Sequence, residues 1–496
     1  MSSIRFVLAA PAALTIAFSL ACYGGASLDG NEAGSDGWLD HTPPAGAELE
    51  ATANDGRCDW LGRPYVSVSV ERVYTLMYSD HSADCGPLNT ADRKVVYSIH
   101  PSLGAEPLID VSGLEDVRLL DTSAGLLLMG ETPTQGEHLW TLDHDTLEIL
   151  AEDVHDVRYW GTRTSPSRRW VAAGDNGVGT LDLHVVDPAT LDTLELDDDA
   201  VWAEAQWLDH DDRLVSLSFD GTYATARLEL WDLRGATSAS GFPVEPVLST
   251  LVSGVSPNLL VSYSWIGIDP LDRFAVFPVH GIDAGESMLL VQDVRDGSVR
   301  TVAGVDGPLR FTPDGSTIVG WSVASPGTLV LVDPITLDTT TVDLPMDGLP
   351  EYVMGFDGNQ LLIADAWGGE DLVIYDLDAD ASVVLPFTAS LQTWTTRGND
   401  VYLVDADRLL HVDMDTATAE QVDLPWTPRH VVWAPVGDVL YVDDRMAPRA
   451  RFLDPETFAV RGSQVLIPDA VPQLDLSEHH DLERDEPVSA GLLARQ

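Results

Sequence analysis

Two runs of acidic residues are the first candidates for chemistry in this sequence. Residues 197–199 (DDD) and 209–212 (DHDD) each place several carboxylates within a few positions. Carboxylate oxygens suit Ca²⁺, but neither run has the DxDxDG spacing with a distal Glu of a calcium loop. Aspartates that accept hydrogen bonds from turn backbones are more common. We therefore expect turns and no metal site here.

Other residue types that carry out catalysis are scattered. The sequence has no HExxH motif and no GxxxxGK[ST] phosphate loop. Residues 320–324 (GWSVA) come close to GxSxG, but the last position is Ala and the surrounding pattern predicts a strand instead of a strand–turn–helix elbow. His479 and His480 form a pair in an acidic tail, where solvation is more common than metal binding. The sequence predicts no catalytic residue and no cofactor.

Fourteen tryptophans offer aromatic contact surface. Seven of them fall in predicted strands, where packing between adjacent blades is their ordinary role: Trp140, Trp170, Trp207, Trp231, Trp265, Trp321 and Trp433. Trp367 and Trp426 fall in predicted loops, and we interpret them as a candidate binding surface. An insertion at 235–260 is a second candidate contact surface.

These residues are positioned by a repeat. A hairpin-opening aspartate recurs at spacings of 44, 45, 61, 40, 43, 37 and 41 residues, at Asp143, Asp187, Asp232, Asp293, Asp333, Asp376, Asp413 and Asp454. A weaker copy of the repeat at 95–111 lies about one period before Asp143. A period of about 40–45 residues with about four short strands is typical of β-propeller blades. The spacing of 61 indicates the insertion at 235–260.

The clearest repeat unit is the stretch 328–344 (TLVLVDPITLDTTTVDL). Two runs of β-branched and aliphatic residues flank Asp333-Pro334-Ile335-Thr336, which predicts a β-hairpin with a type I turn. Helical periodicity is nearly absent from the chain. We therefore expect an all-β fold.

Motifs within the repeat resemble those of TolB-like and YVTN-type bacterial β-propellers. FTPDGSTIV at 311–319 is similar to their "SPDG" strand pairs, and VDPATLD at 186–192 and VDPITLD at 332–338 are similar to their "DPxT" hairpins. The resemblance covers about residues 64–466. It implies a propeller of four-stranded antiparallel sheets, and no particular activity, since propellers host many functions. We predict eight blades, with seven or nine as alternatives; segment 64–112 either completes the ring or packs as an additional sheet.

The N-terminus has the features of an export signal. Arg5 precedes an apolar run, and residues 1–21 predict a signal peptide cleaved before Cys22. The stretch SLAC resembles a bacterial lipobox, which implies that Cys22 carries a lipid anchor. An ordinary secretory signal with an incidental cysteine is the alternative.

The three cysteines fit this interpretation. Exported proteins favour disulfides, and Cys58 and Cys85 flank the first predicted strand pair, so we expect them to pair and leave Cys22 unpaired. The predicted organisation is a signal peptide at 1–21, a flexible acidic tether at 22–57, a propeller at 58–466 and an acidic tail at 467–496.

Charge narrows the classes of partner. The chain has 80 acidic and 27 basic residues, a formal net charge of −53, and Lys94 is its only lysine. Such a surface repels phosphate backbones and anionic headgroups, which argues against nucleic acid and charge-driven membrane binding. Solubility, adaptation to high salt and divalent-cation binding remain three explanations of the acidity.

The repeat, the export signal and the lack of a catalytic motif lead to two hypotheses about function. The first is a non-enzymatic, exported lipoprotein that acts as a protein-interaction or ligand-binding module at the cell envelope, anchored to the outer membrane and binding an envelope or surface protein. The alternative is a metal-dependent propeller hydrolase, lyase or lactonase with its site in the central channel.

Overall fold

The structure is a computed structural model of the 496-residue chain. It describes residues 58–61, 65–67, 72–80, 93–101 and 104–476, apart from short stretches within the last range. Those stretches are 133–135, 156–158, 176–182, 198–201, 220–221, 223, 237–244, 258–265, 283–286, 308–309, 323, 347–349, 357–358, 366–371, 388–392, 406, 436 and 468–469.

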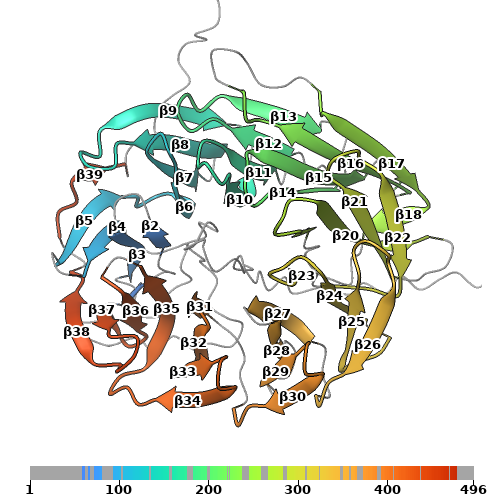
Figure 1. The fold of residues 1–496 in the computed structure, drawn as a ribbon. Helices are drawn as coiled ribbons and strands as arrows, with labels where there is room; N and C mark the ends of the chain where they lie inside the picture. Colours follow the sequence, from blue (N-terminus) through green and yellow to red (C-terminus); the bar gives the residue numbers. More distant parts are fainter. Residues whose placement is uncertain are drawn as a thin grey trace, which may run out of the picture.

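The described residues form nine sheets arranged as the blades of a ring (Figure 1). Their strands pair antiparallel, except for one short strand that joins the first sheet in parallel. Blades 1 to 3 contain β1 (Cys58–Leu61), β2 (Tyr65–Ser67), β3 (Arg72–Asp80), β4 (Arg93–His100) and β5 (Gly104–Asp110); β6 (Glu115–Asp121), β7 (Leu126–Thr132), β8 (Gly136–Leu142) and β9 (Ile149–His155); and β10 (Tyr159–Thr164), β11 (Val171–Asp175), β12 (Leu183–Val186) and β13 (Thr193–Asp197).

Blades 4 to 6 contain β14 (Trp202–Trp207), β15 (Arg213–Phe219), β16 (Thr225–Asp232) and β17 (Leu248–Ser253); β18 (Val255–Pro257), β19 (Gly267–Ile268), β20 (Phe274–Gly281), β21 (Ser287–Asp293) and β22 (Val299–Ala303); and β23 (Arg310–Phe311), β24 (Ile318–Trp321), β25 (Thr328–Val332) and β26 (Thr339–Asp343).

Blades 7 to 9 contain β27 (Pro350–Phe356), β28 (Gln360–Asp365), β29 (Leu372–Asp376) and β30 (Ala381–Val384); β31 (Thr393–Arg397), β32 (Asp400–Asp405), β33 (Arg408–Asp413) and β34 (Thr418–Val422); and β35 (Pro428–Ala434), β36 (Val439–Asp444), β37 (Ala447–Leu453) and β38 (Val460–Val465). The last strand is β39 (Leu474–Asp475).

The predicted all-β propeller is confirmed, but the favoured count of eight blades is wrong. The ring has nine, one of the two alternatives, because β1 to β5 form a full blade. This blade lacks the hairpin aspartate of the others: its last two strands pair through His100 and Gly104 across a different turn. The described residues form no helix long and apolar enough to span a membrane.

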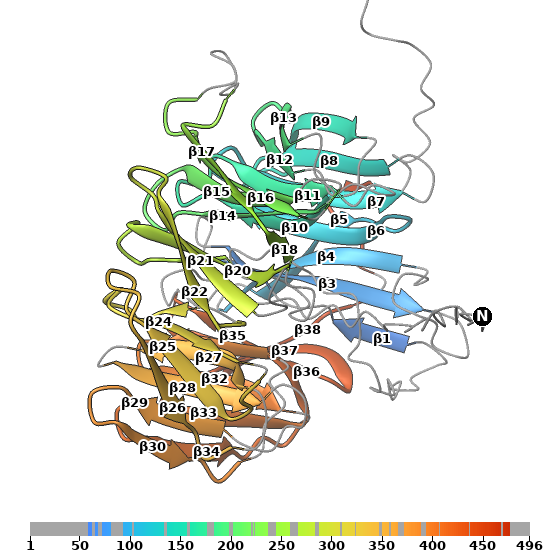
Figure 2. The same ribbon diagram turned by 90° about the vertical axis from the view of Figure 1, so that its right-hand side faces the viewer.

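The core is divided among the seams between blades. Nine hydrophobic clusters of buried residues each combine side chains of two neighbouring blades, from the seam of blades 1 and 2 round to that of blades 9 and 1. Alternate residues of each strand face opposite neighbours. In blade 2, for example, Leu139 packs toward blade 3 and Trp140 toward blade 1. Figure 2 shows the sheets stacked in this way from the side.

The hairpin between the last two strands of a blade follows one pattern in most blades. In blade 3, Asp187 accepts a 2.9 Å hydrogen bond on its side chain from the N–H of Ala189, and the N–H of Leu191 donates to its carbonyl at 2.7 Å. Leu191 has a φ of 62° and is fully buried. The left-handed residue extends the predicted type I turn by one position, and burial of its side chain offsets the cost of positive φ.

We expect Asp187→Ala to lower the free energy of unfolding by about 1 kcal/mol, because the N–H of Ala189 loses its acceptor and the turn loses its cap. Thermal unfolding followed by circular dichroism measures this. Asp145→Ala is the control, since Asp145 is an exposed residue inside the corresponding turn of blade 2. Equal losses in both variants would contradict the role given to Asp187.

The ring is closed by the chain after the last blade. β39 pairs in parallel with β5, the outer strand of blade 1, with Leu474 opposite Ile109. The N–H of Leu476 donates to the carbonyl of Asp110 at 2.8 Å, and the Leu476 side chain is fully buried in the core between blades 1 and 2. Arg93 donates to the carbonyl of Ala470 at 2.9 Å. Residues 470–476 of the segment 467–496, which the sequence predicts as an acidic tail, therefore pack on blade 1, because Leu474 and Leu476 enter an apolar seam.

Candidate functional site: the turn face

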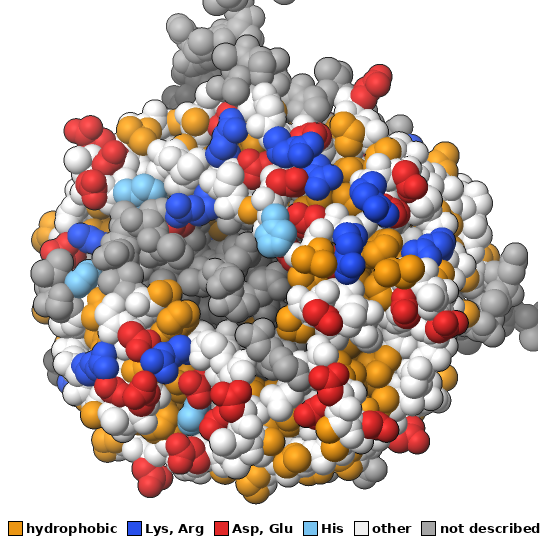
Figure 3. Space-filling model, in the orientation of Figure 1, with side chains coloured by type: hydrophobic (Ala, Val, Ile, Leu, Met, Phe, Trp, Pro, Cys, Tyr) orange, Lys and Arg blue, Asp and Glu red, His pale blue; other side chains and the backbone are white. Residues whose placement is uncertain are grey.

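One face of the ring carries the turns that join the first to the second strand and the third to the fourth strand of each blade. We call it the turn face. Antiparallel strands place these two kinds of turn at the same end of every sheet. In Figure 3, basic side chains gather over the upper right of the ring and a second group lies at the lower left, interspersed with acidic ones.

Polar bonds join the first turns of successive blades along this face. Arg168 of blade 3 pairs with Asp121 of blade 2 at 2.8 Å, and the hydroxyl of Ser167 donates to Asp212 of blade 4 at 2.5 Å. The N–H of Asp209 in blade 4 donates to Asp272 of blade 5 at 2.9 Å. These carboxylates therefore hold neighbouring blades together.

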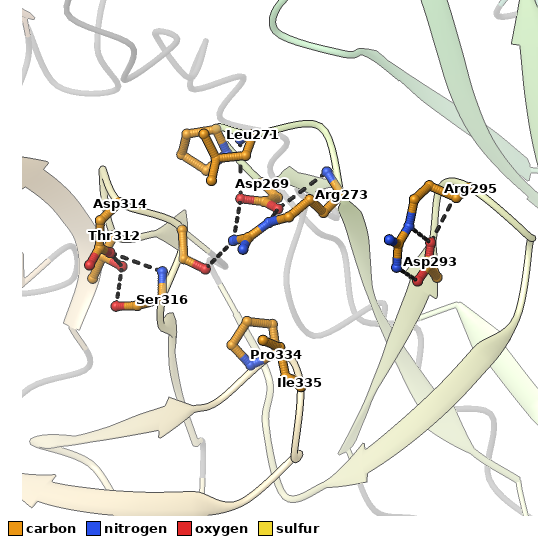
Figure 4. Close-up of polar contacts among 12 residues, drawn as sticks. Asp269, Leu271, Arg273, Asp293, Arg295, Thr312, Asp314, Ser316, Pro334 and Ile335 are labelled. Atoms are coloured by element: carbon orange, nitrogen blue, oxygen red, sulfur yellow. Dashed lines mark hydrogen bonds and ion pairs between the residues drawn. The ribbon is translucent and has the colours of Figure 1, made fainter.

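Figure 4 shows the corresponding link between blades 5 and 6. Asp269 has its side chain fully buried and pairs with Arg273, whose Nη2 lies 3.1 Å from Asp269 Oδ1 and 2.8 Å from the carbonyl oxygen of Gly315. The hydrogen bond to Asp269 raises the pKa of Arg273. Farther out, Arg295 donates to Asp293 at 2.7 Å and lowers the pKa of that carboxyl.

The link leaves no room for a side chain at Gly315. This residue has a φ of +67°, and a Cβ there would lie 2.2 Å from Asp269 Oδ1 and 2.6 Å from Arg273 Nη2. Gly304 has a similar φ of +78° with nothing within 4 Å of its Cβ position. The two glycines therefore differ in the space around them and hardly at all in backbone conformation.

We expect Gly315→Ala to destabilise the protein by about 1–3 kcal/mol more than Gly304→Ala, because only the former displaces a half-buried ion pair. Urea unfolding of both variants measures the difference, and the strain of positive φ cancels between them. If the two variants lose the same stability, the Asp269–Arg273 link does not join blades 5 and 6 in solution.

The acidic run 209–212 behaves as a turn, as expected. Asp211 accepts from Arg213 at 2.9 Å, Asp212 accepts from Ser167, and His210 Nε2 lies 2.7 Å from the carbonyl oxygen of Pro270. No group of three His, Cys, Asp or Glu side chains suited to a metal ion occurs among the described residues. Of the other run, only Asp197 is described; it ends β13.

A buried charged cluster lies in the seam between blades 2 and 3. Arg118 pairs with Glu137 at 3.1 Å and also donates to the carbonyl oxygen of Tyr159. The backbone N–H of Tyr159 in turn donates to the Glu137 carboxylate at 3.4 Å. Both charged side chains are almost fully buried. Burial raises the pKa of Glu137 to about 7 against the attraction of Arg118. Glu131, opposite Glu137 in the strand ladder, adds a repulsive charge.

A second buried pair joins His430 and Asp443 in blade 9. The imidazole Nδ1 lies 2.7 Å from one carboxylate oxygen, and the peptide N–H of His430 donates to the other at 2.6 Å. The register between β35 and β36 shifts at this point, so His430 stands in a bulge. Asp443 satisfies a backbone N–H that the bulge removes from the strand ladder. The pair therefore has a structural role in the sheet.

The structure describes only one of the two tryptophans predicted as a binding surface. Trp426 is half-buried: it packs against the core between blades 8 and 9, and the guanidinium of Arg451 lies 3.9 Å from its ring centroid. Trp367 lies outside the described residues. Trp426 therefore packs against the blades and the Arg451 side chain. The binding surface predicted at Trp367 and Trp426 stays a prediction. Gly320 and Trp321 lie in β24, as the strand prediction requires.

The cysteine predictions are not tested. Cys58 begins β1, where it lies opposite Asp80 of β3. Cys22, Cys85, His479 and His480 lie outside the described residues. Lipidation of Cys22 and a bond between Cys58 and Cys85 stay predictions.

The sequence analysis missed the Arg118–Glu137 pair and the Asp269–Arg273 link. A signal for the first exists: Glu137, Leu139 and Thr141 alternate on one side of β8, so Glu137 occupies a core-facing position. The second leaves no such signal, because Asp269 and Arg273 reach blade 6 through the backbone carbonyl of Gly315, which no residue type reports.

The comparisons with known proteins concern the fold alone. No protein-family model matches the sequence, and no curated protein is significantly similar to it. Among solved structures, a eukaryotic initiation factor is 13% identical, with a TM-score of 0.49 over 75% of this chain and 95% of that chain. TolB from Acinetobacter baumannii is 14% identical, with a TM-score of 0.32 over 63% of this chain and 79% of that chain. An oligogalacturonate lyase in complex with manganese is 13% identical, with a TM-score of 0.38 over 64% of this chain and 93% of that chain. Such neighbours include enzymes and non-enzymes.

Proposed function

We propose that this protein is a non-enzymatic, exported β-propeller that acts as a protein-interaction or ligand-binding module at the cell envelope, held to the outer membrane through a lipid on Cys22. The observation that carries the proposal is how the turn face uses its polar groups. The carboxylates and guanidiniums at its seams bind each other and the backbone of the next blade. At the described seams these side chains are held by one another, which makes a preorganised surface.

Rigidity favours recognition. A surface whose side chains are already fixed by ion pairs loses little conformational entropy when a partner binds. The net charge of −53 adds long-range attraction for partners with basic surfaces and repels nucleic acid. The partner expected on these grounds is an envelope or surface protein.

The alternative function, a metal-dependent enzyme in the central channel, has no described feature in its favour. It needs His, Asp or Glu side chains from several blades at one depth of the channel. The described residues contain no such group of three.

In-cell crosslinking followed by mass spectrometry tests the proposal. The reagent must couple carboxylates, because the only lysine, Lys94, is buried and donates from Nζ to the carbonyl of Leu114. We expect a lipid-modified Cys22 peptide and a reproducible protein partner crosslinked through Asp or Glu. An unmodified N-terminus with no partner would overturn the proposal.

A further inference from the structure

The basic residues of the ring are absent from one sector. Residues 311–396, which span most of blade 6 and all of blade 7, contain 13 acidic residues and no lysine or arginine. The lower right of the ring in Figure 3, over these blades, shows red and orange side chains without blue. In the chain as a whole there is one basic residue for about every three acidic ones, so this sector differs in charge balance from the rest.

In the described part of blade 7, the carboxylates of the hairpin before β30 bind uncharged groups. Asp378 accepts from the amide of Asn359 at 3.2 Å, and Asp380 accepts from the hydroxyl of Tyr375 at 2.6 Å. Both carboxylates are exposed. On blade 5, by contrast, the hairpin before the outer strand contains an arginine, Arg295, which binds Asp293.

The same aspartates stand next to an uncharged sheet edge. β30 is the outer strand of blade 7 and lies at the rim of the ring (Figure 1). All four of its residues are exposed, with Val383 at 44% and Val384 at 46%. Proteins commonly protect such edges with charged side chains, and β30 has none.

Half of the backbone groups of β30 point away from its partner. The N–H of Leu385 donates to Leu372 at 2.8 Å, so this pair is hydrogen-bonded, as is every second pair along the ladder. The N–H groups of Ser382 and Val384 therefore face outward. They can bind the carbonyls of an added strand.

The molecule already uses this mode of binding once. β39, from the segment LDL, adds to the outer edge of blade 1 and places Leu476 in a core. The outer edge of a blade in this fold therefore accepts an extended segment.

We propose that β30 is a docking edge for an extended, basic segment of the partner protein, which adds as a fifth strand to blade 7 while its lysines or arginines face the Asp378 and Asp380 side. The inference rests on the proposed function, since it names the surface and the chemistry of the partner. Backbone bonds to β30 give affinity, Val383 and Val384 contact alternate apolar side chains, and the acidic turn selects basic flanks.

A direct test uses the peptide Arg-Arg-Thr-Val-Thr-Val-Thr-Arg-Arg, with glutamates replacing the arginines as a charge control, and fluorescence anisotropy on the full chain. We expect the basic peptide to bind, the acidic one to bind at least about tenfold more weakly, and the difference to shrink in high salt. Val384→Lys and Ser382→Pro should each weaken binding about tenfold, the first by charge and the second by removing an outward N–H.

The matched control is Val465→Lys. Val465 is a 54% exposed valine on β38, the outer strand of blade 9. It should leave binding within about twofold of the wild type, and melting curves should show that all three variants fold. Equal binding of both peptides, or equal losses at Val384 and Val465, would overturn the docking edge. A partner crosslinked in cells through other blades would overturn it too, while the proposed function would stand; absence of any partner would remove both.

Discussion

Leu476→Ala is expected to lower the free energy of unfolding by about 2–4 kcal/mol, although the residue lies outside the repeat. Its side chain is fully buried in the core between blades 1 and 2, and removing a buried leucine leaves a cavity. The substitution also weakens the strand that closes the ring, since β39 contributes only two residues to the ladder. Urea unfolding followed by tryptophan fluorescence measures the loss.

Val471→Ala is the matched control. Val471 lies five residues away in the same segment and is 85% exposed, so its truncation should leave stability within about 0.5 kcal/mol. If Leu476→Ala were equally mild, the segment after blade 9 would not pack on blade 1 in solution.

Glu137→Gln is expected to remove a pH dependence of stability. Glu137 has a pKa of about 7 in the folded chain, against an ordinary value of 4.5, mainly because it is buried. Between these values the unfolded chain has released the proton that the folded chain still holds. The free energy of unfolding therefore falls as pH rises from about 4.5 to 7, by about 3 kcal/mol in all. The glutamine keeps the shape and does not titrate.

Urea unfolding of both proteins at intervals from pH 4.5 to 8 measures the slope. Glu106→Gln is the control, since Glu106 is exposed and pairs with Arg72 at 3.7 Å. A slope unchanged by Glu137→Gln would show that the carboxyl is ionised throughout this range.

The turn aspartates act in the opposite sense at lower pH. Backbone N–H groups of Thr336 and Ile335 lower the pKa of Asp333. A carboxyl with a lowered pKa stabilises the folded chain at pH values above the pKa of an unfolded aspartate, about 3.9. This stabilisation is lost as the pH falls below that value.

The architecture was readable from the sequence because each blade repeats its local rules. The hairpin aspartate and the run of β-branched and aliphatic residues at Thr328–Val332 report backbone geometry within one blade, and the structure has that hairpin. The blade count was not readable in the same way. Blade 1 is built around a different turn, and closure by β39 depends on a pairing between residues more than 360 positions apart.

The candidate site was harder to predict for a physical reason. Alternation along β8 places Glu137 on the same side of the strand as Leu139, which faces blade 3. Its partner Arg118 lies on another strand and donates to a carbonyl of blade 3, and no local pattern reports that contact. The charge imbalance of residues 311–396 is visible in the sequence. Only the structure shows that β30, within that stretch, has all four residues exposed.

The separate core in each seam has an evolutionary consequence. A duplication of one blade would add one seam and leave the pair of blades at each other seam the same, because no cluster contains side chains from more than two blades. Only the curvature of the ring and the closing strand would need to adapt. Rings of this kind can therefore change size by whole blades, provided that the closing strand β39 still meets β5.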